Sequence, residues 1–381
     1  MSKIKVTCIM PNRSWTVGEI RLTMPLKAVC QRHPEIECHF IAVFDVTSED
    51  LENTNIVILQ RIASPFVERL AKKLLAMQVP YVYEIDDLLW DMPRDLLSSS
   101  AWRRNKKRLF FLLKNASAVT TSTQNIAGKL YELNTNVHVI PNVLCQEVKK
   151  NISFNSNAKL ILSATDRMYI NTVSSVLKSL QDTLSTEIIA LGPVAHDLRK
   201  KGVQVNEFPV MGLEEYSAWL NSLDNVIALC PLDSSNFSKC KSAIKYHSYS
   251  LAGIPVLASN QEPYSNVIEH QHNGYLISQD TTAAWLEAIL LHLKNPDLLE
   301  KYVKNASIYS QNPPDPVASW YDLLIRLYND SRKSIHNFEI PSSWDWGYLR
   351  YFFSVEKYIA LFRLIKQYGL KKIFLLLRKG M

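Results

Sequence analysis

The segment over residues 226–258 constrains the fold of this chain most strongly. Residues 226–229 form a short apolar run, a polar loop rich in Ser and Lys follows, and a second apolar run lies at residues 254–258. Short apolar runs bounded by turn residues are typical of buried strands of a parallel sheet. The residues between them predict a helix that begins near Ser242 and ends at Gly253, because glycine commonly terminates helices. The segment therefore predicts a strand–helix–strand unit of a parallel sheet.

The loop before this expected helix carries groups that suit an anion. Ligands of open parallel sheets bind at the carboxyl ends of the strands, where helix N-termini present unpaired N–H groups. A helix N-terminus with ammonium groups attached attracts negative charge, so we expect a phosphate group here. The cationic and hydroxyl residues of this region are Lys239, Lys241, Lys245, Ser235, Ser238 and Ser242.

The rest of the chain alternates strands and helices in the same way. A chain of 381 residues exceeds one ordinary hydrophobic core, so two domains are expected. The alternation predicts an α/β protein with doubly wound parallel sheets. The expected parts are a first domain over 1–145, a linker over 146–158, a second domain over 159–316, a helix over 317–330 and a tail over 331–381.

Composition excludes several classes of protein. Hydrophobic residues make up 47% and charged residues 21%, which indicates a globular chain. The six cysteines form no CxxC pairs and predict reduced thiols without a zinc site. The N-terminus enters a strand without a secretory leader, and no run reaches about 18 apolar residues, so we expect a cytoplasmic protein without a membrane span.

Two adjacent acids, Asp86 and Asp87, follow an apolar strand expected over residues 79–85. At the carboxyl end of a parallel strand, an acid can orient an acceptor hydroxyl or take its proton. The pair could instead hold a divalent ion beside a phosphate, or one of them could cap the next turn. Because adjacent side chains on a strand diverge, only one is expected to face a cleft.

Two basic segments raise the question of a membrane surface. A helix expected over residues 101–115 carries a run of cations that is either a solvated face or a contact with lipid phosphates. From Trp346 onward, the chain contains eight Lys or Arg but only one Glu, interspersed with aromatic and aliphatic residues. This pattern is typical of a basic amphipathic helix lying in the interface of an anionic membrane, with packing on the body or on a partner subunit as the alternative. Nucleic acid is not expected, because the aromatics alternate with aliphatic residues rather than forming a stacking surface.

Residues 228–277 also carry a resemblance to a known family. In order they contain PL, a Phe, KSAIKYHSYSLAGIPVLAS, PY and NGYLI. This series resembles the C-terminal domain of nucleotide-sugar glycosyltransferases of the GT-B fold, in the retaining family 4 (glycosyl transferases group 1) branch found in polysaccharide and O-antigen assembly. The resemblance extends over about residues 3–330. It implies two Rossmann-like domains that face a cleft, the first for an acceptor and the second for a nucleoside-diphosphate sugar. It also implies that the helix over 317–330 is a crossover helix, which returns to the first domain.

The resemblance also implies an activity. The enzyme would transfer a hexosyl group with retention of configuration to a saccharide hydroxyl, including one on a polyprenyl-diphosphate carrier, in capsule or lipopolysaccharide synthesis. Neither a cofactor nor an essential metal is expected. A lipid-linked acceptor would explain a basic tail that binds the inner face of the cell membrane, and other assembly enzymes would be further partners.

Several residues take roles from the resemblance. Arg167 or Lys178 would contact the diphosphate together with Lys241, Ser242 and Lys245. A planar guanidinium suits phosphate oxygens. Arg21 lies in a segment that faces the cleft in relatives, where it would meet donor phosphate or acceptor; the alternative is a solvated loop arginine.

The chain departs from the family at one motif. Most members place two glutamates eight positions apart, and the second binds the ribose; here these positions hold Cys240 and Ser248. A serine still bonds a ribose hydroxyl, but less strongly than a carboxylate does. Either an acid such as Glu262 compensates, or the donor is held differently, or the chain is a non-catalytic scaffold of an assembly complex. A phosphorylase or epimerase on the same fold is a further alternative.

Overall fold

The computed structural model describes residues 3–12, 16–94, 96, 98–142, 144, 149, 153–163, 170–310 and 315–331, the side chains of 307–310 excepted. The expected tail therefore lies outside the described residues, apart from Ser331. Among the described residues, no helix combines the length and the apolar character needed to cross a bilayer.

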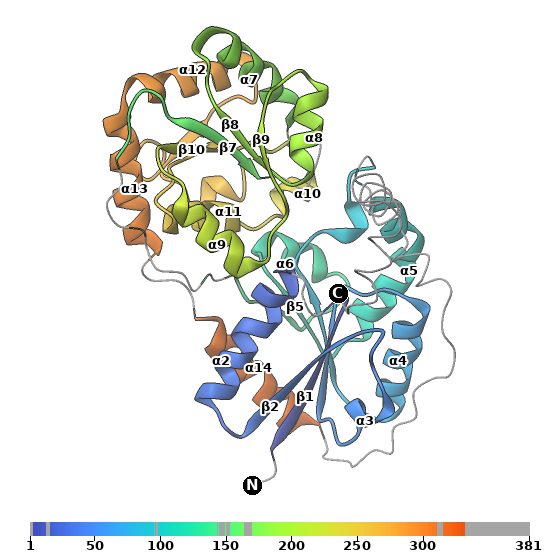
Figure 1. Ribbon diagram of the computed structural model, residues 1–381. Helices are drawn as coiled ribbons and strands as arrows, with labels where there is room; N and C mark the ends of the chain where they lie inside the picture. Colours follow the sequence, from blue (N-terminus) through green and yellow to red (C-terminus); the bar gives the residue numbers. More distant parts are fainter. Residues whose placement is uncertain are drawn as a thin grey trace, which may run out of the picture.

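The described chain forms two six-stranded parallel sheets, each with helices on both faces (Figure 1). The first sheet has the order β2-β1-β3-β4-β5-β6 and the second the order β12-β11-β10-β7-β8-β9. The strand pairings of both sheets are parallel, for example Gln60 of β3 opposite Glu84 of β4 and Ala228 of β10 opposite Val256 of β11. The expectation of two doubly wound parallel sheets is confirmed.

The strands of the first sheet are β1 (Ile4–Met10), β2 (Ile36–Ala42), β3 (Ile56–Gln60), β4 (Tyr81–Ile85), β5 (Ala118–Thr121) and β6 (Val137–Val139). Those of the second are β7 (Lys159–Ser163), β8 (Ile188–Leu191), β9 (Asn206–Phe208), β10 (Val226–Cys230), β11 (Val256–Ser259) and β12 (Tyr275–Ile277). All five residues of β3, β4 and β10 are buried, as expected of strands covered on both faces.

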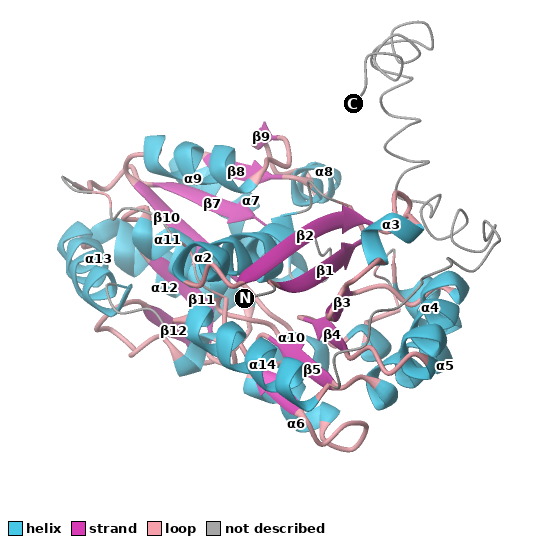
Figure 2. Ribbon diagram, turned by 90° about the horizontal axis from the view of Figure 1, so that it is seen from below, coloured by secondary structure: helices cyan, strands magenta, loops and turns pink. Residues whose placement is uncertain are grey.

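One face of the first sheet packs against α4 (Pro65–Ala76), α5 (Ser99–Asn115) and α6 (Gln124–Leu130), and the other against α2 (Met24–Arg32) and α14 (Pro316–Asp330). Figure 2 shows the strands lying between these helices. The first half also contains α1 (Thr16–Gly18), the π-helix η1 (Glu19–Thr23), α3 (Ser48–Leu51) and the 3-10 turn η2 (Leu89–Asp91).

In the second half, α7 (Asn171–Leu184), α8 (Pro193–Lys200) and α12 (Thr282–Lys294) cover one face, and α9 (Leu213–Ser222), α11 (Ile244–Leu251) and α13 (Pro296–Ser310) the other. The short helix α10 (Asn236–Lys239) and the 3-10 turn η4 (Tyr264–Asn266) complete it. Side-chain caps begin several helices, as where Ser64 accepts from Val67 N before α4 and Thr281 from Ala284 N before α12.

The loop after β10 differs from the sequence-based expectation. A polar loop followed by one helix from Ser242 to Gly253 was predicted, but Ser235 caps the separate helix α10 and α11 begins only at Ile244. The side chain of Ser235 accepts from Ser238 N, which is the local bond that starts α10. Helix α8 was not anticipated either, although Gly192 and Pro193 are typical of a helix start.

Helix α14 returns to the first sheet, where it lies beside α2 (Figure 1). Trp320 is fully buried and belongs to the same cluster as Val6 and Ile58. An exposed ion pair of 2.7 Å between Arg32 Nη1 and Asp315 Oδ2 lies at its start. Because exposed ion pairs contribute little, burial of Trp320 is the main attachment of this helix.

We expect the substitution Trp320→Ala to lower the free energy of unfolding by about 3–5 kcal/mol, because it removes a large buried ring and leaves a cavity. The exposed neighbour Ser319 in the same helix provides the control, and Ser319→Ala should stay within about 0.5 kcal/mol of the parent. Urea unfolding measures both. Equal stabilities for the two variants would show that α14 is not anchored through Trp320.

Candidate functional site

The carboxyl ends of the two sheets meet. Asp87, Thr123 and Asn142 follow the ends of β4, β5 and β6, and they contact three residues that follow the end of β10, namely Lys241, Cys240 and Ser242. Both sheets therefore present their ligand-binding edges to the same interface, as the resemblance implied.

The segment around α10 makes most of this interface. Phe237 and Cys240 are 2% and 3% exposed and belong to the hydrophobic cluster of the first domain, not of the second. Thr123 Oγ1 donates to the Cys240 carbonyl over 3.1 Å, and Asn125 Nδ2 donates to the Lys239 carbonyl over 2.7 Å. The loop of the second domain is thus inserted into the first.

The two acids Asp86 and Asp87 share one guanidinium. Arg61 Nη1 lies 2.6 Å from Asp86 Oδ1 and 3.3 Å from Asp87 Oδ2. The expectation that the two side chains diverge is wrong, because β4 ends at Ile85 and the pleat does not continue into the turn that carries them. No side chain caps η2, so the capping alternative at this turn is also wrong.

Burial and neighbouring charges act on these acids in opposite directions. Burial raises the pKa of Asp86, the Arg61 guanidinium opposes that increase and the neighbouring Asp87 adds to it. A carboxyl group with a raised pKa is better suited to accept a proton than an ordinary aspartate is. Its ion pair with Arg61 must loosen before it does so.

Arg21 is not a solvated loop arginine, since its side chain is only 2% exposed. Its Nε donates to Glu84 Oε1 over 2.7 Å, and Nη1 donates to the Ile140 carbonyl and, over 3.0 Å, to Asn142 Oδ1. Glu84 is fully buried at the end of β4, and burial raises its pKa while Arg21 opposes the rise. The hydrogen bonds of Arg21 to Glu84, Ile140 and Asn142 therefore all lie within the first domain.

The predicted donor-binding residues Lys241, Ser242 and Lys245 gather at the end of β10. Lys241 Nζ lies 3.5 Å from Asp87 Oδ1 of the first domain and 4.4 Å from the centroid of the Phe237 ring. Ser242 Oγ accepts from Asn142 Nδ2 over 2.9 Å. The half-buried Lys245 lowers the pKa of the Cys230 thiol, against the larger effect of burial, which places its charge near the carboxyl end of β10.

Ser248 and Glu262 occupy different environments. Ser248 is 7% exposed and donates its hydroxyl to the Ile244 carbonyl over 2.9 Å, so its oxygen remains available as an acceptor. Glu262 Oε2 accepts from Asn125 Nδ2 over 2.6 Å and Oε1 from Asn266 Nδ2 over 3.3 Å. Glu262 thus lies at the interface, whereas Ser248 lies inside α11.

Arg167 lies outside the described residues. The second diphosphate candidate, Lys178, is exposed in the middle of α7 and forms an i,i+4 pair with Asp182. It lines a shallow hollow together with Glu187 and Ile188, which are at the amino end of β8. Lys178 is therefore on the wrong edge of the sheet for a ligand at the interface.

Sequence reasoning missed Arg61, Asn125 and Asn142. Arg61 directly follows β3 and has a φ of 46°, so the rule that singled out Asp86 also applies to it. Asn142 lies in the IPNVL segment that ends the first half. Nothing in the sequence signals that Asn125, the second residue of α6, contacts Lys239 and Glu262.

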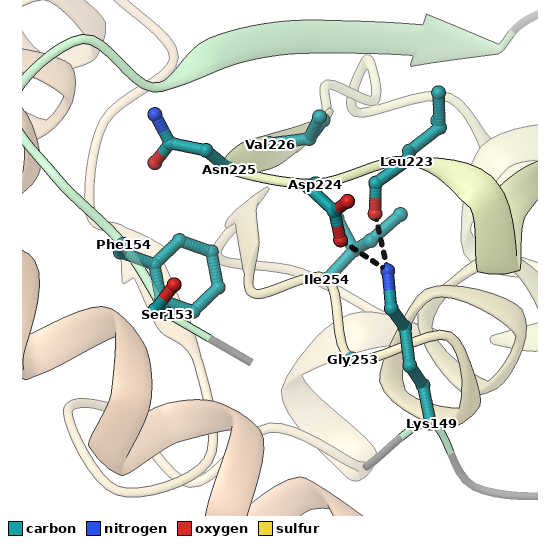
Figure 3. Close-up of a pocket in the computed structure, with 9 residues that line it drawn as sticks. All are labelled: Lys149, Ser153, Phe154, Leu223, Asp224, Asn225, Val226, Gly253 and Ile254. Carbon is teal, nitrogen blue, oxygen red and sulfur yellow. Dashed lines mark hydrogen bonds and ion pairs between the residues drawn. The ribbon is translucent and has the colours of Figure 1, made fainter. Parts of the chain in front are cut away.

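A hollow of about 270 Å³ lies elsewhere, beside the linker (Figure 3). Its walls include Asn225, which immediately precedes β10, and Ile254, two residues before the start of β11, so it opens at the amino ends of the strands. Lys149 Nζ donates there to the Leu223 carbonyl and to Asp224 Oδ1, each over 2.6 Å. This hollow therefore lies at the edge of the sheet opposite the interface.

No group of three or more His, Cys, Asp or Glu within the described residues could hold a metal ion. The cationic and hydroxyl groups at the interface instead suit an anionic ligand.

Two doubly wound domains with facing carboxyl edges define a GT-B fold, and comparisons with known proteins agree. Residues 249–308 match the family model "Glycosyl transferases group 1". A search of curated proteins found no match.

Solved structures share the fold at low sequence identity. HepE from Anabaena, in complex with UDP and glucose, is 14% identical with a TM-score of 0.60, over 85% of this chain and 100% of its own. Sucrose-phosphate synthase from Thermosynechococcus elongatus is 12% identical with a TM-score of 0.61, over 86% and 100%. TarM from S. aureus is 13% identical with a TM-score of 0.54, over 74% of this chain and 57% of its own, so the chain spans just over half of TarM. The solved structures therefore share the two-domain fold of this chain, and the family model matches part of its second half.

We expect Arg21→Ala to lower the free energy of unfolding by about 3–5 kcal/mol at neutral pH, because it leaves the Glu84 charge buried without its partner. Without Arg21, the pKa of Glu84 rises further above its unfolded value of about 4.3. The native state then binds more protons than the unfolded state between these two pKa values, so the free energy of unfolding falls as the pH rises. The loss of unfolding free energy in Arg21→Ala relative to the parent, here called the deficit, should therefore be smaller at about pH 5 than at about pH 8.

Chemical unfolding at both pH values tests this expectation. The control is Arg21→Ala combined with Glu84→Gln, which removes the titrating group and should remove the difference between the deficits at the two pH values. A deficit in Arg21→Ala that does not change with pH would contradict a buried, charged Glu84.

Proposed function

We propose that the protein is a glycosyltransferase that moves a sugar from a nucleoside-diphosphate sugar to a saccharide hydroxyl. The observation that carries the proposal is the convergence of Lys241, Ser242 and Lys245 at the carboxyl end of β10, where Lys241 and Ser242 contact the first domain. The family match follows directly in the sequence, from residue 249.

The chemistry requires stabilisation of the departing diphosphate, on which negative charge develops as the glycosidic bond breaks. The ammonium groups of Lys241 and Lys245 and the first N–H groups of α11 supply positive potential, and Arg167 is proposed to add a guanidinium. In this scheme neither a metal nor another cofactor is required. Ser248, or Glu262 instead, is proposed to bind the ribose.

The acceptor is proposed to lie on the first domain, where Asp86 or Asp87 orients its hydroxyl and accepts the proton. Diphosphate oxygens compete with Asp87 for the Lys241 ammonium, so donor binding would release Asp87 from this pair and leave it to the acceptor. Transfer with retention, as in family 4 enzymes, is part of the proposal.

We expect Lys241→Ala and Lys245→Ala each to weaken nucleoside-diphosphate binding about tenfold or more, because each removes a charge-assisted contact with phosphate. UDP is the first probe, since HepE and TarM were each solved with it. Isothermal titration calorimetry gives the affinities.

The matched control is Lys200→Ala, because Lys200 is an exposed lysine of the same domain, at the last residue of α8. Its substitution should leave the affinity unchanged. If all three variants bind UDP as tightly as the parent does, the proposed phosphate site is wrong.

The acceptor is further proposed to be lipid-linked, in O-antigen or capsule synthesis, with the protein at the inner membrane surface. Helix α5 contains six Lys or Arg and no Asp or Glu, and Arg103, Arg104, Lys106, Lys107 and Lys114 are exposed. A face of this kind is attracted to anionic headgroups by about 1 kcal/mol for each cation near the surface. The basic tail beyond Trp346, outside the described residues, is proposed to add an apolar anchor.

We expect Arg104→Glu with Lys107→Glu to lower binding to vesicles containing anionic lipid roughly tenfold or more at low salt. The control exchanges two exposed lysines of the second domain, Lys200→Glu with Lys201→Glu, which carries the same net charge change. Deletion of residues 346–381 tests the tail in the same sedimentation assay. Equal binding by the parent and the α5 variant would rule out α5 as the contact.

A non-catalytic scaffold is the second candidate, and Cys240 favours it. This position would hold a glutamate in most relatives, but here it is 3% exposed and packs in the cluster of the first domain. Assays of donor hydrolysis and sugar transfer with common nucleotide sugars separate the candidates, since a scaffold would show no turnover with any of them.

A further inference from the structure

A chain of hydrogen bonds runs from the interior of the first domain to the loop before α11. Gln60 Nε2 donates to Glu84 Oε2 over 3.0 Å, and Arg21 Nε donates to Glu84 Oε1 over 2.7 Å. Arg21 Nη1 then donates to Asn142 Oδ1 over 3.0 Å, and Asn142 Nδ2 donates to Ser242 Oγ over 2.9 Å. The chain therefore begins at buried groups and ends on a residue of the second domain.

The direction of each bond follows from chemistry. A guanidinium has donors only, so the Asn142 atom that faces Arg21 must be the amide oxygen. The amide nitrogen then faces Ser242, and because it too only donates, Ser242 Oγ must accept. The bond from Arg21 thus determines the orientation of the Asn142 amide and, through it, the orientation of the Ser242 hydroxyl.

The hydroxyl proton of Ser242 points away from Asn142 as a result. The described residues contain no acceptor to which Ser242 donates. Lys241, the adjacent residue, is held from the same first domain by Asp87. An anion beside Lys241 would therefore meet both an ammonium group and a hydroxyl group whose proton is available.

We propose that Arg21 and Asn142 are positioning residues for the donor diphosphate, acting through Ser242, so that the first domain orients a phosphate-binding group of the second. This inference rests on the proposed function. Arg21 itself is 2% exposed and its Nε and Nη1 groups are used internally, so it acts through Asn142 rather than by contact with the ligand.

Calorimetry with UDP on the full chain tests the coupling through a double-mutant cycle. Ser242→Ala should weaken UDP binding by about tenfold. Asn142→Ala should weaken it by a smaller factor, because Asn142 acts only through Ser242. In the Ser242→Ala background, Asn142→Ala should have no further effect, because the hydroxyl through which it acts is gone. Additive effects of the two substitutions would overturn the proposal, as would unchanged affinity in both single variants.

Asn142→Asp provides the sharper variant. The aspartate still accepts from Arg21, but its second oxygen accepts from Ser242 and so turns the hydroxyl proton away from the ligand. The Asn142→Asp variant should bind UDP more weakly than the Asn142→Ala variant does. Part of this loss comes from the reversed Ser242 hydroxyl, and that part should vanish when Ser242→Ala is also present. The Ser242→Thr variant keeps the hydroxyl, so it should retain most of the UDP affinity that the Ser242→Ala variant loses.

A merely structural role would instead appear as a lower melting temperature with unchanged affinity, and that result would also overturn the proposal. Failure of the proposed function gives a different result, because the parent protein itself would bind none of UDP, GDP, ADP and dTDP. The expected outcome is that the parent binds UDP, that the Asn142 and Ser242 variants lose affinity, and that the effects of the two substitutions are not additive.

Discussion

The arrangement of the two domains depends on the insertion of the α10 segment into the first domain. Phe237 and Cys240 belong to the chain of the second domain, yet their side chains complete the hydrophobic cluster formed by β4, α4 and α5. Burial of an aromatic ring is the largest non-directional contribution available at such an interface. Around it, the bonds from Thr123 and Asn125 to backbone carbonyls set the register of the two edges. The candidate site lies directly after this anchor in the sequence, so its position relative to the first domain follows from the anchor.

Charges at the end of the first sheet are buried in pairs. Arg21 with Glu84 and Arg61 with Asp86 both lie at the ends of β3 and β4, where a single unpaired charge would carry a large desolvation penalty. Pairing reduces that penalty, and it also places two rigid guanidinium groups beneath the interface. One pair leads through Asn142 to Ser242 and the other through Asp87 to Lys241. Adjacent residues of the second domain are thus held by separate polar networks of the first.

The candidate site was only partly visible in the sequence. Lys241, Ser242 and Lys245 could be identified because they follow an apolar strand and precede a helix, which is where parallel sheets bind ligands. Arg21 was identified, but its environment was not, because a segment rich in polar residues gives no indication that an arginine meets a buried glutamate 63 residues later. Lys178 lies at the other edge of the sheet, because α7 runs from the carboxyl ends of the strands toward their amino ends.

The sequence by itself determined the fold, since the apolar strands, the helix signals and their alternation are local patterns that leave only a doubly wound arrangement. It also located the edge that is proposed to bind an anion, because that edge is defined by strand direction. Only the tertiary structure decided which polar groups meet across the interface, since Asn142 and Ser242 are 100 residues apart and Asp87 and Lys241 are 154 apart. Contacts of this kind depend on how two separately folded cores pack against each other, and no periodicity in the chain records that packing.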